Sequence, residues 1–400
     1  MERLDNMQVK ISDYLWFQEG PGVRNTQYTE TGVKLLNVAN LVDGKVDITN
    51  TSRYISEEEA YGKYKHFLVD DGDFIIASSG IKVEYFDKKM GFVTIDQLPL
   101  CMNTSTIRFK VIDKDKLNIR YFMYYLKSDE FKEQLARQIT GSAQLNFGPS
   151  HLKKMTMPII DLEEQEELVS NLDYVEFLIT ARREQLTKLD KLVKSRFIEL
   201  FGDPATNPMG WTETTVGEEC YYIKDGPHKS LPDVGKGNGY PFISVRNIVN
   251  GYIDFSTAKY ISEQDYLDSI KKCHPQKGDM LYSKGGTTGI AKLIDVDVEF
   301  ANWVHVAVLK FRDSLNGVFF EKMLNSDYCY DQSQKLTKGV ANRDLVLSAM
   351  AKIRIYKPPI ELQEQFAAFV EQVDKSKLVI QESLAELETL KKALMQKYFG

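Results

Sequence analysis

Residues 161–202 read DLEEQEELVSNLDYVEFLITARREQLTKLDKLVKSRFIELFG, and this stretch decides how the chain folds. Steps of alternating three and four residues give Leu172, Val175, Ile179, Arg182, Leu186, Leu189, Val193, Arg196 and Leu200, of which seven in nine are apolar. No proline or glycine interrupts the stretch before Gly202. The pattern therefore predicts one long helix that packs along another helix through a narrow apolar seam. At about 1.5 Å per residue this helix is roughly 60 Å long.

The long stretch has a second copy near the C-terminus. Adding 198 to each seam number again gives seven apolar positions in nine, while Gln165 returns as Gln363 and Phe201-Gly202 as Phe399-Gly400. We expect the two helices to form an intramolecular coiled coil through the apolar seam residues Leu172, Val175, Ile179, Leu186, Leu189, Val193, Val370, Val373, Ile380, Leu384, Leu387 and Leu394. The alternative is that each helix only covers its own domain, although so long and narrow a seam is unusual in that role.

The segments that precede the two helices also repeat each other. GVKLLNVANLVDGKVDI (32–48) alternates around Asp43-Gly44, which predicts a hairpin, and GYPFISVRNIVNGYIDF (239–255) matches it at an offset of 207. Gly20-Pro21 and Gly72-Asp73 return as Gly226-Pro227 and Gly278-Asp279. In the first copy, residues 55–64 predict a short helix and residues 119–138 a longer amphipathic one. Matched positions in the same order indicate duplicated domains.

The fold class that follows is α/β, of mixed α+β type. It has two similar globular domains, separated by two long antiparallel helices that form a coiled coil, with pseudo-twofold symmetry. The predicted boundaries are 1–160 for the first domain, 161–202 for the first helix, 203–358 for the second domain and 359–400 for the second helix. FGDPATNPMGW (201–211) is the linker between the copies, because its glycine, proline and asparagine residues end the helix.

Composition and charge exclude several classes of protein. No run of 18 apolar residues is present, which argues against a membrane span, and MERLDNMQVK at the N-terminus lacks the apolar core of a signal peptide. We therefore expect a cytoplasmic protein with four reduced, buried cysteines. The net charge of -6 comes from the two helices, since the globular segments balance their acidic and basic residues. Any DNA binding by the globular segments therefore depends on local basic patches.

The motifs of common enzymes are absent. GGTTGIAK (285–292) lacks the spacing of a phosphate-binding loop, and no GxGxxG follows a predicted strand. Asn207-Pro208 precedes Met-Gly rather than the Pro-aromatic pair of an amino-methyltransferase, and the five histidines lack the spacing of metal ligands. Asp279 and Lys284 alone are weak support for a nuclease. The sequence thus predicts a protein that is not an enzyme and holds no metal.

The duplicated arrangement resembles the specificity subunit of type I restriction–modification systems. The resemblance covers essentially the whole chain and rests on three features: the linker at 201–211, the paired hairpin and Gly-Asp blocks, and the paired approaches to the helices, which include PPIELQEQF (358–366). MPIID (157–161) departs from the pattern, because it lacks the double proline of Pro358-Pro359. We expect this departure to change only the turn between domain and helix.

The resemblance implies a non-catalytic subunit that acts on double-stranded DNA. Each globular domain would read one half of a bipartite target, and the helices would act as a spacer and as the docking site for two adenine-N6 methyltransferase subunits. Restriction subunits with ATP-driven translocation join some complexes of this kind. S-adenosylmethionine, ATP and Mg are then expected in the partner subunits, with no cofactor in this chain and no membrane partner.

Residues that read DNA are expected on loops that contain glycine, because base edges and phosphates are contacted by exposed polar and basic side chains. The candidates are Arg24, Lys82, Lys88, Lys89 and Gln144 in the first domain, and Lys224, His228, Lys229, Arg246, Lys284, Thr287, Thr288 and Arg343 in the second. The alternative for each of them is ordinary solvated surface. For the whole chain, the alternative functions are a protein-only scaffold whose coiled coil joins two binding modules, and a self-contained enzyme.

Overall fold

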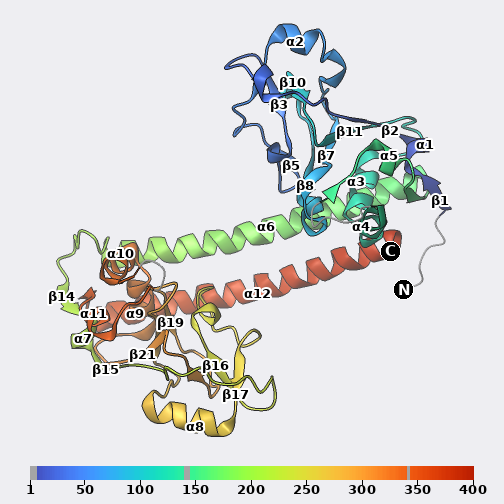
Figure 1. The fold of residues 1–400 in the computed structure, drawn as a ribbon. Coiled ribbons are helices and arrows are strands. Elements are labelled where there is room, and N and C mark those ends of the chain that lie inside the picture. The colour runs from blue at the N-terminus through green and yellow to red at the C-terminus, as the bar shows by residue number, and fades with distance from the viewer. Residues whose placement is uncertain (1–6, 139–144, 340–342) are drawn as a thin grey trace. The chain divides into compact units, whose positions relative to one another are not determined.

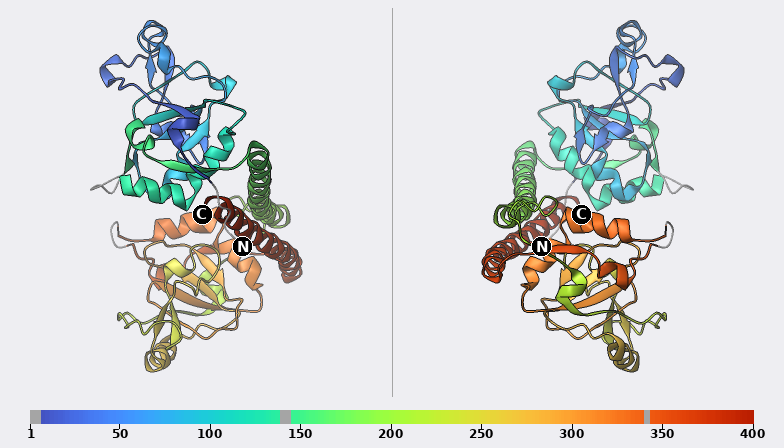
Figure 2. Two further views of the ribbon diagram at one scale, coloured as in Figure 1. Left: turned by 90° about the vertical axis from the view of Figure 1, so that its right-hand side faces the viewer. Right: turned by 90° about the vertical axis from the view of Figure 1, so that its left-hand side faces the viewer.

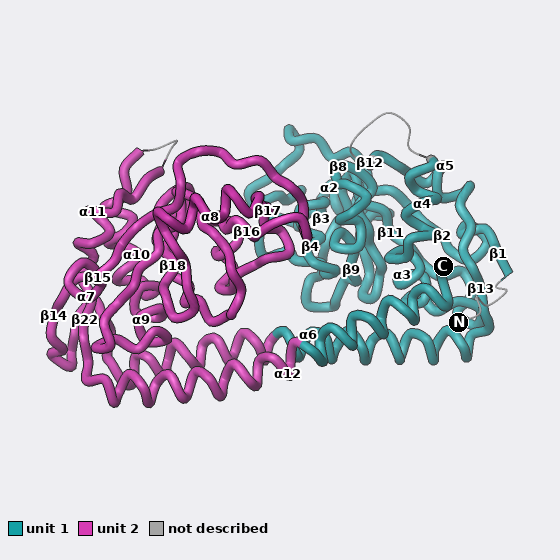
Figure 3. Tube along the Cα trace, turned by 90° about the horizontal axis from the view of Figure 1, so that it is seen from below, with its two compact units in different colours: residues 1–183, 382–400 teal, residues 184–381 magenta. Residues whose placement is uncertain are grey.

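The computed structural model of the chain describes residues 7–138, 145–339 and 343–400. Two compact units are present: unit 1 comprises residues 1–183 and 382–400, and unit 2 comprises residues 184–381 (Figure 3). The long helices α6 (Leu162–Phe201) and α12 (Ile360–Phe399) each contribute one part to each unit. Each unit is therefore built from one globular part and a section of both helices.

The globular part of unit 1 contains a four-stranded antiparallel sheet of order β2-β11-β7-β9 and a three-stranded sheet of order β10-β3-β6. Two-stranded pairs are β1-β13, β4-β5 and β8-β12. The strands are β1 (Met7–Lys10), β2 (Leu15–Glu19), β3 (Val33–Leu36), β4 (Leu41–Val42), β5 (Lys45–Val46), β6 (Tyr54–Ile55), β7 (Phe74–Ala77), β8 (Ser79–Ile81), β9 (Met90–Phe92), β10 (Leu100–Met102), β11 (Thr106–Val111), β12 (Leu145–Asn146) and β13 (Thr156–Ile159). The short α-helices are α1 (Ile11–Tyr14), α2 (Glu57–Tyr61), α3 (Ile119–Lys127), α4 (Asp129–Gln138) and α5 (Pro149–Leu152).

Unit 2 repeats this topology. Its four-stranded sheet has the order β15-β21-β18-β19, its three-stranded sheet has the order β17-β16-β20, and β14 pairs with β22. The strands are β14 (Thr212–Thr215), β15 (Cys220–Asp225), β16 (Tyr240–Ile243), β17 (Lys259–Ile261), β18 (Met280–Ser283), β19 (Ala291–Leu293), β20 (Ala301–Asn302), β21 (Val306–Phe311) and β22 (Arg354–Lys357). The helices are α7 (Val216–Glu219), α8 (Glu263–Lys272), α9 (Gly317–Leu324), α10 (Asp327–Leu336) and α11 (Leu347–Met350). In Figures 1 and 2, α9 and α10 lie beside the long helices, whereas α8 lies at the opposite edge of the globular part.

The two long helices pack against each other antiparallel within each unit, as the heptad pattern predicts. All twelve predicted apolar seam residues are buried or half-buried. In unit 1, Lys391 Nζ lies 2.9 Å from Glu176 Oε1, and Arg183 pairs with Glu388 at 2.7 Å. In unit 2, Lys377 Nζ lies 2.7 Å from Asp190 Oδ1. The charged seam positions of α12 are therefore stabilised by carboxylates of α6.

A buried glutamine joins each globular part to its long helix. Gln165 Oε1 accepts from the backbone N–H of Asn118 at 2.9 Å, and its Nε2 donates to the carbonyls of Lys116 and Ile160 at 3.0 and 2.9 Å. Gln363 repeats this arrangement in unit 2, accepting from Asn316 N at 2.9 Å and donating to the carbonyls of Ser314 and Pro358. Both side chains are fully buried. The match between Gln165 and Gln363 in the sequence thus reflects the same junction built twice.

Two local expectations need correction. Residues 119–138 form two helices rather than one, because Ser128 is extended (φ -73°, ψ 158°) and its Oγ accepts from Phe131 N at 3.2 Å, which caps the second helix. The first hairpin forms at Asp43-Gly44, where β4 pairs with β5. Its counterpart near Gly251 keeps the closing bond from Asp254 N to Asn247 O at 2.8 Å, but it has no strand pair among the described residues.

The linker after α6 closes the end of that helix. Gly202 has a φ of +76°, and a Cβ there would lie 2.5 Å from Pro208 Cγ. Trp211 Nε1 donates to the Phe201 carbonyl at 2.8 Å, which satisfies one of the free carbonyls at the helix end. Asn207 holds the turn by exchanging two hydrogen bonds with the Trp211 backbone, at 2.9 and 3.0 Å. The predicted helix stop at Gly202 is confirmed.

Candidate nucleic-acid interface

The clearest basic loop of unit 1 connects the central strand β7 with the edge strand β9. It contains β8 and a 3-10 helix, η4 (Val83–Lys88). Phe86 is fully buried, with its ring centroid 5.5 Å from that of Phe131 and 6.0 Å from that of Phe147, so the loop is anchored in the core. Tyr85, the preceding residue, remains 50% exposed. The alternation of Tyr85 and Phe86 thus presents an aromatic side chain to solvent on a fixed support.

Three of the predicted lysines converge on this loop. Lys82, Lys88 and Lys89 line a cavity of about 420 Å³, together with Tyr85 and residues 42–43 of the β4-β5 hairpin. Lys82 and Lys88 are exposed, whereas Lys89 Nζ donates to the Leu41 carbonyl at 2.8 Å and ties the loop to the hairpin. Lysine charges that are free of carboxylate partners attract phosphates, and the structure gives Lys82 and Lys88 no ion pair within the described residues.

The β4-β5 hairpin packs closely against β9, the strand that follows the η4 loop, because β9 contains Gly91. A Cβ at this position would lie 2.7 Å from Lys45 C and from Val46 N, so any side chain would push the hairpin away. The Gly44 amide also donates to the Lys88 carbonyl at 3.2 Å. Positive φ angles at Asp43 (47°) and Gly44 (80°) form the tight turn at the hairpin tip. These contacts hold the lysines of the loop and the hairpin as one surface.

Gln144 lies outside the described residues, so the structure does not place it. Its neighbours Leu145 and Asn146 form β12, which pairs with β8 beside Lys82. Arg24 is exposed on a separate loop, in which its backbone N–H donates to Gln27 Oε1 at 3.1 Å. Among the described residues, no hydrogen bond or ion pair joins Arg24 to the lysine loop.

The equivalent loop of unit 2 connects β18 with β19 and brings four predicted residues together. Lys284 Nζ lies 3.0 Å from Asp344 Oδ1 and 3.4 Å from Asp225 Oδ2, and its side chain is only 6% exposed. The Gly286 amide donates to the Arg343 carbonyl at 3.1 Å, and Thr287 beside it is exposed. Thr288 is buried, with its Oγ1 3.1 Å from Thr337 Oγ1. Lys284 and Thr288 are therefore buried, with their polar atoms bound inside the unit.

The remaining predicted residues of unit 2 are exposed but belong to two neighbourhoods. The first neighbourhood surrounds Asp225. His228 belongs to it, because its Nε2 lies 3.8 Å from Asp225 Oδ2, and Asp225 also pairs with the buried Lys284. Lys224 Nζ lies over the Tyr222 ring at 5.1 Å, and Lys229 pairs with Asp265 of α8 at 3.6 Å. Arg246 lies elsewhere, in a cavity of about 260 Å³ that it shares with Lys259 and Trp303.

Glycines fix the loops that carry Arg24 and His228. A Cβ on Gly20 would lie 2.0 Å from the Asn103 carbonyl oxygen, and one on Gly226 would lie 1.7 Å from the Asn302 carbonyl oxygen. Asn103 in turn holds its loop through a bond from Val23 N to its Oδ1 at 3.1 Å. The repeated Gly-Pro pair in the sequence therefore marks a close approach of two backbones in both units.

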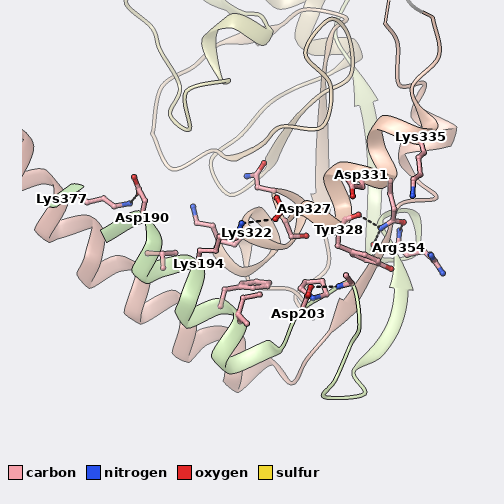
Figure 4. A pocket seen from close by; sticks show the side chains of 18 residues that line it. Asp190, Lys194, Asp203, Lys322, Asp327, Tyr328, Asp331, Lys335, Arg354 and Lys377 are labelled. Atoms are coloured by element: carbon pink, nitrogen blue, oxygen red, sulfur yellow. Dashed lines mark hydrogen bonds and ion pairs between the residues drawn. The ribbon is translucent and has the colours of Figure 1, made fainter. Parts of the chain in front are cut away.

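A larger cavity of unit 2 has a different character. It has a volume of about 560 Å³ and lies beside α6 and α10 (Figure 4). Two pairs of its charged side chains are joined to each other, Lys194 with Asp327 at 3.1 Å and Lys377 with Asp190 at 2.7 Å. Because four aspartates lie among five basic residues in its lining, the cavity has little net positive charge with which to attract a phosphate backbone.

The thiols and carboxylates of the described residues show no catalytic arrangement. Burial raises the pKa of Cys101, Cys220 and Cys329 to about 12 and that of Cys273 to about 11, so all four thiols are protonated at neutral pH. Within the ranges that the structure describes, no three histidine, cysteine, aspartate or glutamate side chains are placed to hold a metal ion. None of the described helices is long and apolar enough to cross a membrane.

The sequence analysis did not predict Tyr85 as an exposed residue of this loop, although its position in the sequence could have indicated it. Tyr85 stands between Lys82 and Lys88 in a segment that separates two buried strands, where an aromatic residue without a core partner is unusual. Lys259 and Trp303 were also missed, because they lie 44 residues apart and only the fold brings them to Arg246.

Comparison with known proteins decides what the two units are. Residues 29–189 and 208–389 each match the family of the type I restriction modification DNA specificity domain. The chain belongs to this family. It is the DNA specificity subunit of a type I restriction–modification system, with two target-recognition domains, and catalysis resides in the methyltransferase and restriction subunits. The alternatives of a protein-only scaffold and a self-contained enzyme are therefore wrong.

Individual relatives agree with this assignment. The MjaIX type I restriction enzyme specificity subunit of Methanocaldococcus jannaschii is 23% identical over 398 aligned residues, which cover 91% of each chain. The MjaVIII specificity subunit of the same organism is 25% identical over 190 residues, 46% of this chain and 43% of its own. The crystal structure of a type I S subunit from M. genitalium has the same fold, with a TM-score of 0.60, 15% identity, and coverage of 100% of this chain and 98% of that chain. Specificity subunits of this family bind no cofactor themselves and act in complexes with the other subunits and DNA.

Proposed function

We propose that this specificity subunit reads a bipartite DNA target with two recognition domains, residues 1–160 and 203–358. The helices at 161–202 and 359–400 would act as the spacer between the two readings. One observation carries the proposal: both units have the same sheet topology and the same buried glutamine junction, yet their basic loops differ. Equivalent frameworks with different loops suit two half-sites of different sequence.

The proposed DNA contacts follow exposure. Side chains that are exposed and basic or polar would contact phosphates or base edges, and these are Arg24, Lys82, Lys88, Lys224, His228, Lys229, Arg246, Thr287 and Arg343. Lys89, Lys284 and Thr288 would hold the loops in place, since their polar groups are bound inside their own units. Gln144 stays a prediction from the sequence, as does the cytoplasmic location.

The partners we propose are two adenine-N6 methyltransferase subunits that dock on the long helices, joined by restriction subunits. Two copies of one partner need two similar surfaces, and we propose that they are formed by residues matched at the offset of 198. Leu192 and Leu390 are matched leucines that are each 47% exposed, although an exposed leucine contributes little to folding. Matched exposed charges lie nearby at Glu184 and Glu382, and at Lys194 and Lys392. An apolar side chain kept in both copies without a core to pack in supports a shared docking surface.

Methylome sequencing with and without the gene tests the proposal. Deletion of the gene should abolish adenine methylation at one bipartite motif and leave all other motifs unchanged. Replacing residues 203–338 with those of a relative should then change one half of that motif and keep the other. A methylome that is the same in the deletion strain, or a replacement that changes both halves, contradicts the proposal.

A further inference from the structure

The loops that follow the central strand differ in length between the two units. Strand pairing makes Met90 equivalent to Ala291, since they face Ile76 and Tyr282 at the same place in each sheet. Residues 78–89 therefore connect the strands in unit 1, whereas only residues 284–290 do so in unit 2. The loop of unit 1 is therefore five residues longer, and it contains the six-residue helix η4, which carries Tyr85 and is flanked by Lys82 and Lys89. Unit 2 has Gly285-Gly286-Thr287-Thr288-Gly289 at the equivalent site.

One aromatic side chain of η4 packs in the core, whereas the other is exposed. Phe86 anchors the loop among Phe131 and Phe147, while Tyr85 beside it keeps half of its surface in solvent. Leaving a large aromatic ring exposed forgoes the stabilisation that its burial would bring. The loop thus presents one exposed ring next to a buried anchor, and an anchored contact residue lowers the entropic cost of binding a partner.

The charge around Tyr85 fits a nucleic acid. Lys82 and Lys88 are exposed, and no carboxylate of the described residues pairs with either of them. Asp43 is the one acidic residue among those that line the adjoining cavity of about 420 Å³ within the described part of the chain. Two further carboxylates stand on η4: Glu84 is exposed, and Asp87 is half-buried and its charge acts on Lys127. A tyrosine flanked by lysines that lack partners matches the way proteins combine phosphate contacts with a base contact.

We propose that Tyr85 is a specificity-determining residue of the first recognition domain, which contacts base edges of one half-site while Lys82 and Lys88 contact the flanking phosphates. This inference rests on the proposed function, because it assigns the base contact within a domain already proposed to read DNA. It also states that the second recognition domain reads its half-site without an equivalent aromatic contact, because the shorter loop has none.

The test uses the full-length protein in complex with its methyltransferase subunits and measures methylation of DNA duplexes altered at each position of the motif. Tyr85→Ala should lower discrimination about 5- to 150-fold at one or two positions of a single half-site, the loss expected for one base contact. Lys82→Ala and Lys88→Ala should weaken binding to all duplexes alike, each reducing the slope of log affinity against log salt by about 0.9. Tyr61→Ala, which removes another exposed tyrosine of unit 1, is the matched control and should change neither quantity.

The outcomes separate this inference from the proposed function. If Tyr85→Ala folds normally, shown by an unchanged melting temperature, and still discriminates every position as the unaltered protein does, the assignment of Tyr85 is wrong. A loss confined to the other half-site also overturns it. If the unaltered complex shows no bipartite preference at all, the proposed function fails first. Retained discrimination at the second half-site in the Tyr85→Ala complex provides the internal evidence that the complex has assembled correctly.

Discussion

The buried glutamine junction makes a quantitative prediction about stability. Gln165→Ala leaves the Asn118 N–H without its acceptor, and it removes the donor from the carbonyls of Lys116 and Ile160. Stranding a buried backbone group costs about 1–3 kcal/mol, and the two carbonyls add a smaller amount because each has a second lone pair. We expect a loss of about 3 kcal/mol in unit 1. For a unit of this size that corresponds to a fall in its melting temperature of roughly 6–12 °C.

Differential scanning calorimetry with hydrogen exchange checks this prediction. The altered unit should melt first, because the two units need not unfold as one cooperative body. Under native conditions, hydrogen exchange at the Asn118 amide should be faster in Gln165→Ala than in the unaltered protein. Gln363→Ala should cause the same loss in unit 2, since its bonds to Asn316, Ser314 and Pro358 repeat the geometry.

Gln365→Ala is the matched control for both variants, because this exposed glutamine stands two residues from Gln363 on the same helix. It should change stability by less than about 0.5 kcal/mol, as surface substitutions usually do. If Gln165→Ala and Gln363→Ala are as mild as this control, the amide bonds are not what holds each globular part to its helix. The reasoning would also fail if one of the two variants were costly and the other harmless.

Three further predictions follow from other contacts. Leu192→Asp and Leu390→Asp should each remove one methyltransferase copy from the complex, and the double variant should remove both, as measured by native mass spectrometry. The control is Val379→Asp, which should keep both copies, because Val379 is 65% exposed but its matched residue is Ala181. Burial alone raises the pKa of Glu176, but the charges of Lys127 and Lys391 more than offset it, so its net pKa lies below the ordinary 4.5. The stability it contributes is present above about pH 4.5 and is lost as the pH falls through the lower folded value, so urea titrations of Glu176→Gln should differ from the unaltered protein at pH 7 and converge with it in acid. The four buried thiols, with pKa raised to about 11–12 by burial, should resist alkylation at pH 8 until the protein unfolds; rapid labelling of the native protein would show that these cysteines are accessible.

The sequence predicts the parts of this fold that depend on local pattern. The heptad seam, the helix stop at Gly202 and the repeated hairpin signals at Gly44 and Gly251 are all periodicity or turn chemistry, which nearby residues determine. The break at Ser128 escaped because the apolar pattern continues through it, while a single side-chain cap decides where one helix ends and the next begins. Local pattern also predicted strand pairing in the second hairpin, whereas the described residues there form only the turn.

The candidate site was harder to predict, because exposure is a property of the assembled fold. Lys284 is preceded and followed by loop residues and reads as a surface lysine, yet Asp225 and Asp344, each about 60 residues away in sequence, enclose it. The reverse holds for Tyr85, which reads as a core residue until the burial of Phe86 shows which of the two rings fills the core. A residue's type and its sequence neighbours therefore do not determine which distant residues will cover it in the folded protein.

The duplication provides a way to separate folding from function within one chain. Gly20 and Gly226 are matched because any side chain there would collide with a backbone carbonyl, which is a requirement of the fold. The loops at 78–89 and 284–290 share the same framework but differ in length and chemistry, so the fold does not dictate their content. Leu192 and Leu390 are matched although both are exposed, so neither the fold nor a difference between half-sites explains them. Under the proposed function, the loops that diverge on a shared framework would bind the ligand that differs between the halves, which is the DNA sequence. The exposed residues that are identical would bind the partner that the halves have in common.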